Sequence, residues 1–281
     1  MNIGIRLHDT VGTTLSEHLA NAQAQGFSCV HLALQKVIPG FTMARAPELM
    51  TDALAAEVRA DMAAHGQQLA VLGCYLNLAT PDAEELERTY AAYKAHMRFA
   101  APSDCLVIGT ETGAPNAGYK TCPECWTEEA LALFIERLRP VVKWGEEYGS
   151  VIAIEPVCRH IVSTPERAER VLDAIGSDHL QIILDTVNLL NPANHTQADA
   201  LVEESIRRFG DRIRVLHMKD YQVVDGASDV KSMACGLGLM RYDRLLAFAK
   251  AHPGLPMTLE DTVPANAEAA RRHLEAVAAA L

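Results

Sequence analysis

Residues 180–190, LQIILDTVNLL, are the stretch that decides the fold of this protein. Three apolar residues, Ile182, Ile183 and Leu184, follow one another without alternation. Such a run is typical of a strand that is buried on both faces, as in a parallel sheet. The run stops at Asp185, and a carboxylate there needs a cation, a metal ion or hydrogen-bond donors, because burying it unpaired is costly. Asp185 could also cap a following helix.

Seven further segments have the length and apolar content of strands, and helical patterns separate them. The predicted strands are residues 2–8, 28–34, 68–74, 104–109, 151–155, 180–185, 212–217 and 256–260. Capping residues, prolines and glycines place helices at residues 14–25, 48–65, 82–101, 126–148, 165–175, 196–209, from 242 onward and at 265–281. This order predicts an α/β fold, a single (β/α)₈ TIM-barrel domain over residues 1–281. A doubly wound open sheet is the alternative, but no GxGxxG motif follows an early strand.

Length, composition and charge restrict the class of protein. A chain of 281 residues that is 49% hydrophobic can bury a large core. Its formal net charge of −11 argues against a nucleic-acid partner, which needs clustered Lys and Arg. No apolar run is long enough to cross a membrane, and the first ten residues lack the pattern of a signal peptide. We therefore expect a cytoplasmic protein with a small-molecule ligand, and a homo-oligomer is compatible with these features.

The seven cysteines are interpreted as reduced thiols. Cys29, Cys74 and Cys105 fall in strand-like runs, and an odd number does not suit a disulfide framework. Cys122 and Cys125 form a CPEC motif in the loop after the fourth strand. A zinc ribbon would need a second CxxC pair, which the sequence lacks. A redox role stays open because a helix is predicted to follow, but we favour loop cysteines without a catalytic role.

The last four predicted strands all end on a potential metal ligand. These residues are Glu155, Asp185, His217 and Glu260. In a barrel the carboxyl ends of the strands meet on one face, where three carboxylates beside an imidazole would repel one another without a cation. An oxygen-rich set with one histidine favours a divalent ion, Mn²⁺ first, with Mg²⁺, Co²⁺ or Zn²⁺ as alternatives. The structural alternatives are that the glutamates pair with Lys219 and that His217 is a hydrogen-bonded core residue.

Short motifs at the strand ends carry a family resemblance. They are IGIRL at 3–7, YLN at 75–77, GTETG at 109–113, the stretch from Glu155 to His160, LDTVNLL at 184–190, HMKD at 217–220, GLG at 236–238 and LED at 259–261. With these motifs the chain resembles the sugar phosphate isomerase/epimerase superfamily, the xylose-isomerase-like TIM barrels, over nearly its whole length. The resemblance implies one divalent metal ion held by Glu155, Asp185, His217 and Glu260.

The implied site suits a small sugar, keto-sugar or keto-acid. When its carbonyl and neighbouring hydroxyl are bound to the metal ion, the intervening C–H is acidified and a cis-enediolate is stabilised. In the resembling epimerases the first and last metal-bound glutamates move the proton, which points to Glu155 and Glu260. We therefore expect a metal-dependent isomerase or epimerase in carbohydrate metabolism.

Two other classes of function were weighed. A lyase can use the same intermediate, as in an inosose dehydratase or a 3-keto-glycoside β-eliminating enzyme. A repair endonuclease like the related AP endonucleases would need more ligands and a basic surface, which the charge of −11 opposes. A non-catalytic subunit should tolerate loss of the four ligands, yet all four are present.

Several residues near the strand ends are expected to contact the substrate. They are His160, Glu111, Asn188, Lys219 and His8. Lys219 could instead form a structural ion pair with Asp220, and His31 could be a pocket residue or a packing residue. Arg6 could bind an anionic substrate or pair with a carboxylate at a strand end.

Two positions depart from the ketose 3-epimerase pattern. Those enzymes usually have a histidine three residues after the metal aspartate and an arginine six residues after the metal histidine, where this chain has Asn188 and Val223. Both departures count against a free-ketohexose epimerase. The HxKD form at residues 217–220 looks more like the isomerase and dehydratase branches, and no dense basic cradle for a phosphate is visible.

Overall fold

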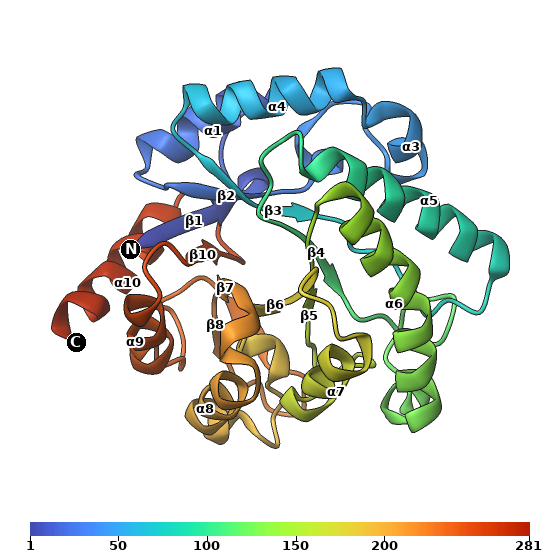
Figure 1. Ribbon diagram of the computed structural model, residues 1–281. Helices are drawn as coiled ribbons and strands as arrows, with labels where there is room; N and C mark the ends of the chain where they lie inside the picture. The colour runs from blue at the N-terminus through green and yellow to red at the C-terminus, as the bar shows by residue number, and fades with distance from the viewer.

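The chain folds into a closed barrel of eight parallel strands, and the computed structural model describes residues 1–281 (Figure 1). Each strand pairs with its neighbours, and β10 pairs with β1 to close the cylinder. The strands are β1 (Asn2–Arg6), β2 (Cys29–Leu32), β3 (Gln68–Gly73), β4 (Val107–Glu111), β5 (Ile152–Glu155), β6 (Leu180–Leu184), β7 (Ile213–Met218) and β10 (Pro256–Leu259). The predicted (β/α)₈ TIM barrel is confirmed, and the open doubly wound sheet is wrong.

Helices surround the barrel on its outside (Figure 1). They are α1 (Leu15–Ala24), α2 (Leu34–Val37), α3 (Ala46–Leu49), α4 (Asp52–Ala64), α5 (Ala83–Ala100), α6 (Glu128–Tyr148), α7 (Pro165–Ile175), α8 (Ala198–Phe209), α9 (Asp243–Ala251) and α10 (Ala267–Ala280). Five helices start at a side chain that accepts a hydrogen bond from a first-turn N–H: Thr14, Thr51, Asp82, Thr127 and Thr164. No helix combines the length and the apolar character needed to span a bilayer.

Two apolar clusters hold these layers together. The larger cluster contains 68 buried residues and joins the strands to the helices. The smaller cluster comes from the strands alone and consists of Cys29, Ala70, Val71, Val107, Ala153, Ile183 and Val215. Because successive residues of a strand point to opposite faces, this second set fills the inside of the barrel. The strand ends are therefore anchored on both faces by packed side chains.

Three predicted elements differ from the observed ones. The helix predicted over residues 48–65 is two helices, α3 and α4, because Thr51 is extended and its side chain caps the new helix at Leu54 N. The strand predicted over residues 2–8 ends at Arg6, and residues 7–9 form a 3₁₀ turn. The fourth strand starts three residues later than predicted, because Asp104 has a φ of 55°, outside the strand region.

The connection after β7 also differs from the prediction, which had a plain loop there. It contains the antiparallel pair β8 (Asp220–Gln222) and β9 (Lys231–Met233). Both strands have only three residues, too few for period-two alternation to stand out in the sequence. The other predicted bounds agree with the observed ones within two residues.

The close approach of β1 and β2 yields a stability prediction. A Cβ at Gly4 would lie 2.2 Å from the backbone oxygen of Cys29. Gly4→Ala should therefore lower the free energy of unfolding by about 1–3 kcal/mol in urea titrations, because paired backbone cannot move aside. Gly210→Ala is the control, since its new methyl group would lie 3.5 Å from the nearest atom and should be neutral or stabilise by up to about 1 kcal/mol. Equal stabilities of the two variants would contradict this account.

Candidate active site

Strand alternation directs the four predicted metal ligands into the barrel mouth. In β6, Ile183 belongs to the cluster inside the barrel, whereas Ile182 and Leu184 belong to the cluster that faces the helices. Asp185 lies two residues after Ile183 and so points inward with it. The same step of two residues along β5, β7 and β10 brings in Glu155, His217 and Glu260.

The four side chains lie close enough together to share one ion. Donor atoms of Glu155, Asp185, His217 and Glu260 all lie within 4.8 Å of one another. His217 Nδ1 is 3.2 Å from Glu155 Oε2 and 3.2 Å from Glu260 Oε1. All four residues are buried, with exposed fractions of 7% or less. Three carboxylates and one imidazole form a donor set that divalent cations accept.

Positive charge from the protein already compensates these carboxylates. Lys219 Nζ lies 2.8 Å from Asp185 Oδ2 and 3.2 Å from Glu260 Oε2. Burial opposes the charged form of Lys219, but the charges of Asp185 and Glu260 outweigh it and raise the lysine pKa. In the same way, His217, Lys219 and Arg6 lower the pKa of Glu260 although burial would raise it.

The imidazole of His217 carries a proton that a metal ion can replace. Burial works to lower the pKa of His217, yet the charges of Glu260 and Glu155 outweigh burial and raise it to about 9. The charged ring of His217 lies between two carboxylates, and its positive charge balances theirs as a bound cation would. Since metal ligation requires the neutral ring, ion binding releases this proton. The residues present therefore fit a divalent cation both in donor type and in charge.

Asp185 and Asn188 connect the ligand cluster to the local backbone. Asp185 Oδ1 accepts the N–H of Asn188 at 3.1 Å, but the N-cap residue of the 3₁₀ turn at Val187–Leu189 is Thr186, so Asp185 is not the cap that was its alternative role. The side chain of Asn188 donates to Glu155 Oε1 at 2.5 Å. This bond leaves the second oxygen of Glu155 facing the histidine. Asn188 thus orients the glutamate at a position where ketose 3-epimerases usually have a histidine.

A cavity of about 350 Å³ opens at the barrel mouth above the cluster. Its walls include four of the five predicted substrate contacts, namely His8, Glu111, Asn188 and Lys219. His160 is not on the wall: its Nδ1 lies 3.8 Å from Glu111 Oε2, and its ring lies 5.1 Å from the ring of Tyr119. His160 therefore lies beside Glu111 and outside the cavity wall, and its Nδ1 has no hydrogen-bond partner.

Two residues near the mouth, Tyr75 and Tyr119, were not predicted as contacts, and His31 takes the pocket role that was one of its two predicted roles. His31 lines the cavity, its ring is stacked at 5.4 Å on the ring of His217, and neither ring nitrogen has a hydrogen-bond partner. Tyr75 also lines the cavity, and its buried hydroxyl has no partner, whereas Tyr119 donates to Glu111 Oε2 at 3.0 Å. Buried polar atoms normally have partners, so unpartnered ones beside a cavity indicate a ligand. One feature of the sequence could have identified Tyr75 as a contact, namely its position just after the third strand.

The predicted alternative of a Lys219–Asp220 ion pair is wrong. Lys219 pairs with the ligand cluster, and Asp220 binds backbone instead. The Asp220 carboxylate accepts N–H bonds of 2.8–3.0 Å from Tyr221, Gly236, Gly238 and Met240. A Cβ at Gly238 would lie 2.1 Å from the backbone oxygen of Tyr221, so only glycine allows this closure. Asp220 thus fixes the β8–β9 segment, whose Ser232 lines the cavity.

Arg6 pairs with carboxylates at strand ends, which was one of its two predicted roles. Its guanidinium lies 3.1 Å from Asp9, 3.5 Å from Asp261 and 3.9 Å from Glu260. The first contact is a hydrogen bond from Nε to Asp9 Oδ2. These contacts hold a positive charge at the edge of the cavity, beside Glu260.

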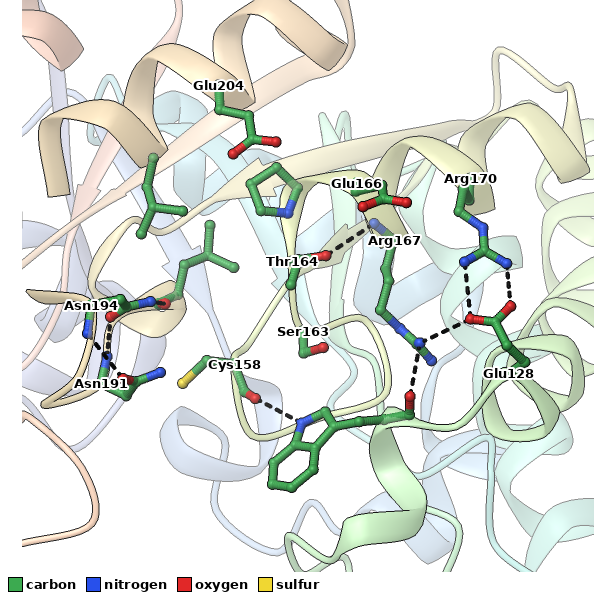
Figure 2. A pocket seen from close by; sticks show the side chains of 14 residues that line it. Glu128, Cys158, Ser163, Thr164, Glu166, Arg167, Arg170, Asn191, Asn194 and Glu204 are labelled. Carbon is green, nitrogen blue, oxygen red and sulfur yellow. Dashed lines mark hydrogen bonds and ion pairs between the residues drawn. The ribbon is translucent and has the colours of Figure 1, made fainter. Parts of the chain in front are cut away.

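A larger pocket, of about 710 Å³, lies beside the start of α7 and shares no lining residue with the cavity above the cluster (Figure 2). Its two arginines are already paired. Arg170 Nη1 donates to Glu128 at 3.1 Å, and Arg167 donates to the backbone oxygens of Ile161, Trp126 and Thr127. None of the predicted ligands or substrate contacts lines this pocket. All the residues predicted for the chemistry therefore lie outside this pocket.

Comparison with known proteins gives one family match and several relatives. The family described as the xylose isomerase-like TIM barrel matches residues 19–279. D-psicose 3-epimerase of Enterocloster bolteae is 37% identical over 150 residues. That alignment covers 50% of this chain and 46% of the epimerase, so the chain matches less than half the length of this curated relative.

Solved structures of an epimerase and of a probable dehydratase share the fold at low sequence identity. The structure of 3-keto-D-glucoside 4-epimerase YcjR from E. coli has a TM-score of 0.75 and 16% identity, covering 98% of this chain and 99% of that one. The probable 3-DHS dehydratase AsbF from Bacillus anthracis has a TM-score of 0.74 and 12% identity, with coverage of 99% and 98%. At these identities the likeness establishes the fold.

Removing the charge of Lys219 tests the electrostatics of the cluster. Lys219→Met would leave Asp185 and Glu260 without their ammonium partner, and breaking a buried pair typically costs about 3–5 kcal/mol. We expect that loss in the free energy of unfolding of EDTA-treated protein, measured with urea, and partial recovery with Mn²⁺. Lys36→Met is the control because Lys36 is an exposed lysine at the rim of the same cavity, and it should change stability by less than about 0.5 kcal/mol. If the Lys219→Met protein were as stable as the parent, Lys219 would not compensate the charges of Asp185 and Glu260.

Proposed function

This chain belongs to the xylose isomerase-like TIM barrel family, and from that membership we propose that it is a divalent-metal-dependent isomerase or epimerase of a small sugar or keto-sugar. The observation that carries the proposal is the buried cluster of three carboxylates and one imidazole at the carboxyl ends of the strands. Active sites of such barrels lie at this face. The similarity to a D-psicose 3-epimerase over half of the chain supports a sugar as the substrate.

We propose that the four converging side chains hold one divalent ion, with Mn²⁺ as the first candidate. The ligands would be Glu155, Asp185, His217 and Glu260. When bound, the ion supplies Lewis-acid chemistry: it polarises the substrate carbonyl and the adjacent hydroxyl, acidifies the C–H between them and stabilises the resulting enediolate. The charged ring of His217 and the paired Lys219 are groups of this chain that already balance the same carboxylates.

Glu155 and Glu260 are placed to transfer the proton. They reach His217 Nδ1 at 3.2 Å each from two different strands, and both line the cavity. A carboxylate on one face of a bound substrate can remove a proton while the other returns one, which interconverts epimers or isomers. Asn188 orients Glu155 through its 2.5 Å hydrogen bond, and Arg6 lies 3.9 Å from Glu260 Oε2.

The other half of the mouth, from β2 to β4, would bind the hydroxyl groups of the substrate. His31, Tyr75 and Glu111 line the cavity on this side. Burial raises the pKa of Glu111, and its Oε2 accepts the hydroxyl of Tyr119 at 3.0 Å. The free polar atoms of His31 and Tyr75 would gain partners in a polyhydroxy compound. His8 at the rim would complete the contacts, and His160 lies beside Glu111, outside the cavity wall.

A lyase acting on the same substrate class is the second candidate, and Lys219 is the residue that favours it. Its ammonium lines the cavity 3.2 Å from Glu260 Oε2. After Glu260 or Glu155 removes the proton next to the carbonyl, an ammonium at this position can protonate a hydroxyl that leaves from the β-carbon. The fold likeness to a probable dehydratase is compatible with such an elimination.

Proton exchange into ketoses tests the function. The Mn²⁺-loaded protein would be incubated in D₂O with D-psicose, D-fructose or a 3-keto-D-glucoside, and NMR would follow loss of the proton beside the carbonyl. Exchange that needs the metal ion supports the proposal, and product analysis separates epimerisation or isomerisation from elimination. Absence of exchange with every one of these substrates, at full metal loading, would overturn a sugar isomerase or epimerase.

The proton-transfer pair yields a mutational prediction. Glu155→Gln and Glu260→Gln should each fold normally, as judged by circular dichroism, and lose at least about 10²-fold of the exchange rate, because positioned acid–base groups contribute about 10²–10⁴-fold. Glu136→Gln serves as the matched control, since Glu136 is an exposed glutamate of α6. Full activity of either active-site variant would remove that glutamate from catalysis.

For Tyr75 we predict that a substitution changes substrate binding without changing the stability of the protein. Tyr75→Phe removes a hydroxyl that has no partner in the fold, so stability should stay within about 0.5 kcal/mol. The KM of the exchanging ketose should rise by about 3- to 10-fold, the value of one lost hydrogen bond. The control is Tyr93→Phe, whose hydroxyl is bonded to Thr110 Oγ1 at 2.6 Å and Leu76 O at 3.0 Å. It should lose about 1 kcal/mol of stability and keep its KM. The opposite pattern would exclude Tyr75 from substrate binding.

A further inference from the structure

We propose that Cys122 and Cys125 form a thiol–disulfide exchange site that a low-molecular-weight disulfide oxidises to an intramolecular bond. Their sulfur atoms lie 3.7 Å apart in one tight turn, in which Cys125 N donates to Cys122 O at 3.0 Å. A disulfide bond is about 2.05 Å long, so the pair must close by about 1.7 Å. Only the side chains of one turn need to adjust, because no other element lies between the two sulfurs.

The two thiols differ in the way that such an exchange requires. Cys122 is partly exposed and can meet a dissolved disulfide, whereas Cys125 is buried. The amide of Asn116 donates to Cys122 Sγ at 3.4 Å and holds that sulfur in place. Burial raises the pKa of Cys125, and the same burial keeps a dissolved disulfide away from its sulfur. Cys122 is therefore the attacking group and Cys125 the resolving group.

The exchange is balanced in two steps. The Cys122 thiolate attacks one sulfur of the oxidant, its S–S bond breaks, and one thiolate leaves while a mixed disulfide forms at Cys122. Cys125 then loses its proton to water, and its thiolate attacks Cys122 Sγ, which releases the second half of the oxidant as a thiolate. Two protein thiols are oxidised, and one external disulfide is reduced to two thiols.

The pair lies on the segment that contacts the active site. Asn116, which binds Cys122 Sγ, also bonds the backbone of Lys120 at 2.7 and 3.0 Å and accepts from Asn77 at its own backbone oxygen. Between these bonds lies Tyr119, whose hydroxyl donates to Glu111. Closing the disulfide moves the sulfur that Asn116 binds, so oxidation acts on the turn that carries Tyr119. This inference stands whatever reaction the barrel catalyses.

The test uses the full-length protein with oxidised glutathione as the probe. Thiol titration and mass spectrometry should show loss of two thiols, a mass decrease of two hydrogen atoms in the peptide holding residues 122 and 125, and reversal by dithiothreitol. Cys125→Ser should accumulate a stable glutathione adduct at Cys122, because nothing resolves it. Cys122→Ser should oxidise at least about 10-fold more slowly than the parent, since the exposed attacking thiol is gone.

Cys158→Ser is the matched control, because Cys158 is also a partly exposed thiol and should not affect the reaction. Circular dichroism would check that each variant folds. Retention of all seven thiols by the folded parent protein would overturn the proposal. So would an adduct at Cys158 with both CPEC thiols reduced, or equal oxidation rates of the parent and Cys122→Ser.

Discussion

The concentration of buried negative charge at the carboxyl ends of the strands is the constraint on which this structure depends. Glu155, Asp185 and Glu260 meet in a volume that one ion could fill, and ionised carboxylates are costly away from water. His217 and Lys219 lower that cost by placing two positive charges among them. Such an arrangement persists only if the scaffold is rigid, and the closed barrel with a packed interior provides that rigidity.

The same constraint divides the barrel mouth into two halves. The strands from β5 to β7, together with β10, carry the charged ligands, and the strands from β2 to β4 carry His31, Tyr75 and Glu111. The first half can bind a cation and move protons. The second half offers polar atoms that the protein itself leaves without partners, which suits the hydroxyl groups of a sugar. A polar substrate bound between the two halves would give hydrogen-bond partners to the second half and would place its reacting atoms beside the carboxylates of the first.

Residues behind the cavity wall hold these groups in place. Asn188 orients Glu155, and Asp220 ties the β8–β9 segment to the rim. Tyr119 holds Glu111 from a turn that Asn116 closes, and Asn116 also contacts Cys122 Sγ. Because each of these supports acts through a hydrogen bond of a loop, loop sequence is where relatives of this barrel can diverge in substrate while keeping the same strand ends.

The sequence by itself determined the barrel and the position of its four ligands. An apolar run without alternation is typical of a strand in a covered parallel sheet, eight strand–helix units in order predict the barrel, and a period of two directs every second residue inward. Residues beyond the strand ends follow no such repeat, so the sequence did not predict the direction of their side chains. His160 was predicted on the cavity wall but lies beside Glu111 and outside that wall, and Lys219 and Asp220 proved to have different partners. Tertiary structure alone decided these contacts, because a loop side chain takes its direction from distant segments that pack against it, and not from a repeat in its own residues.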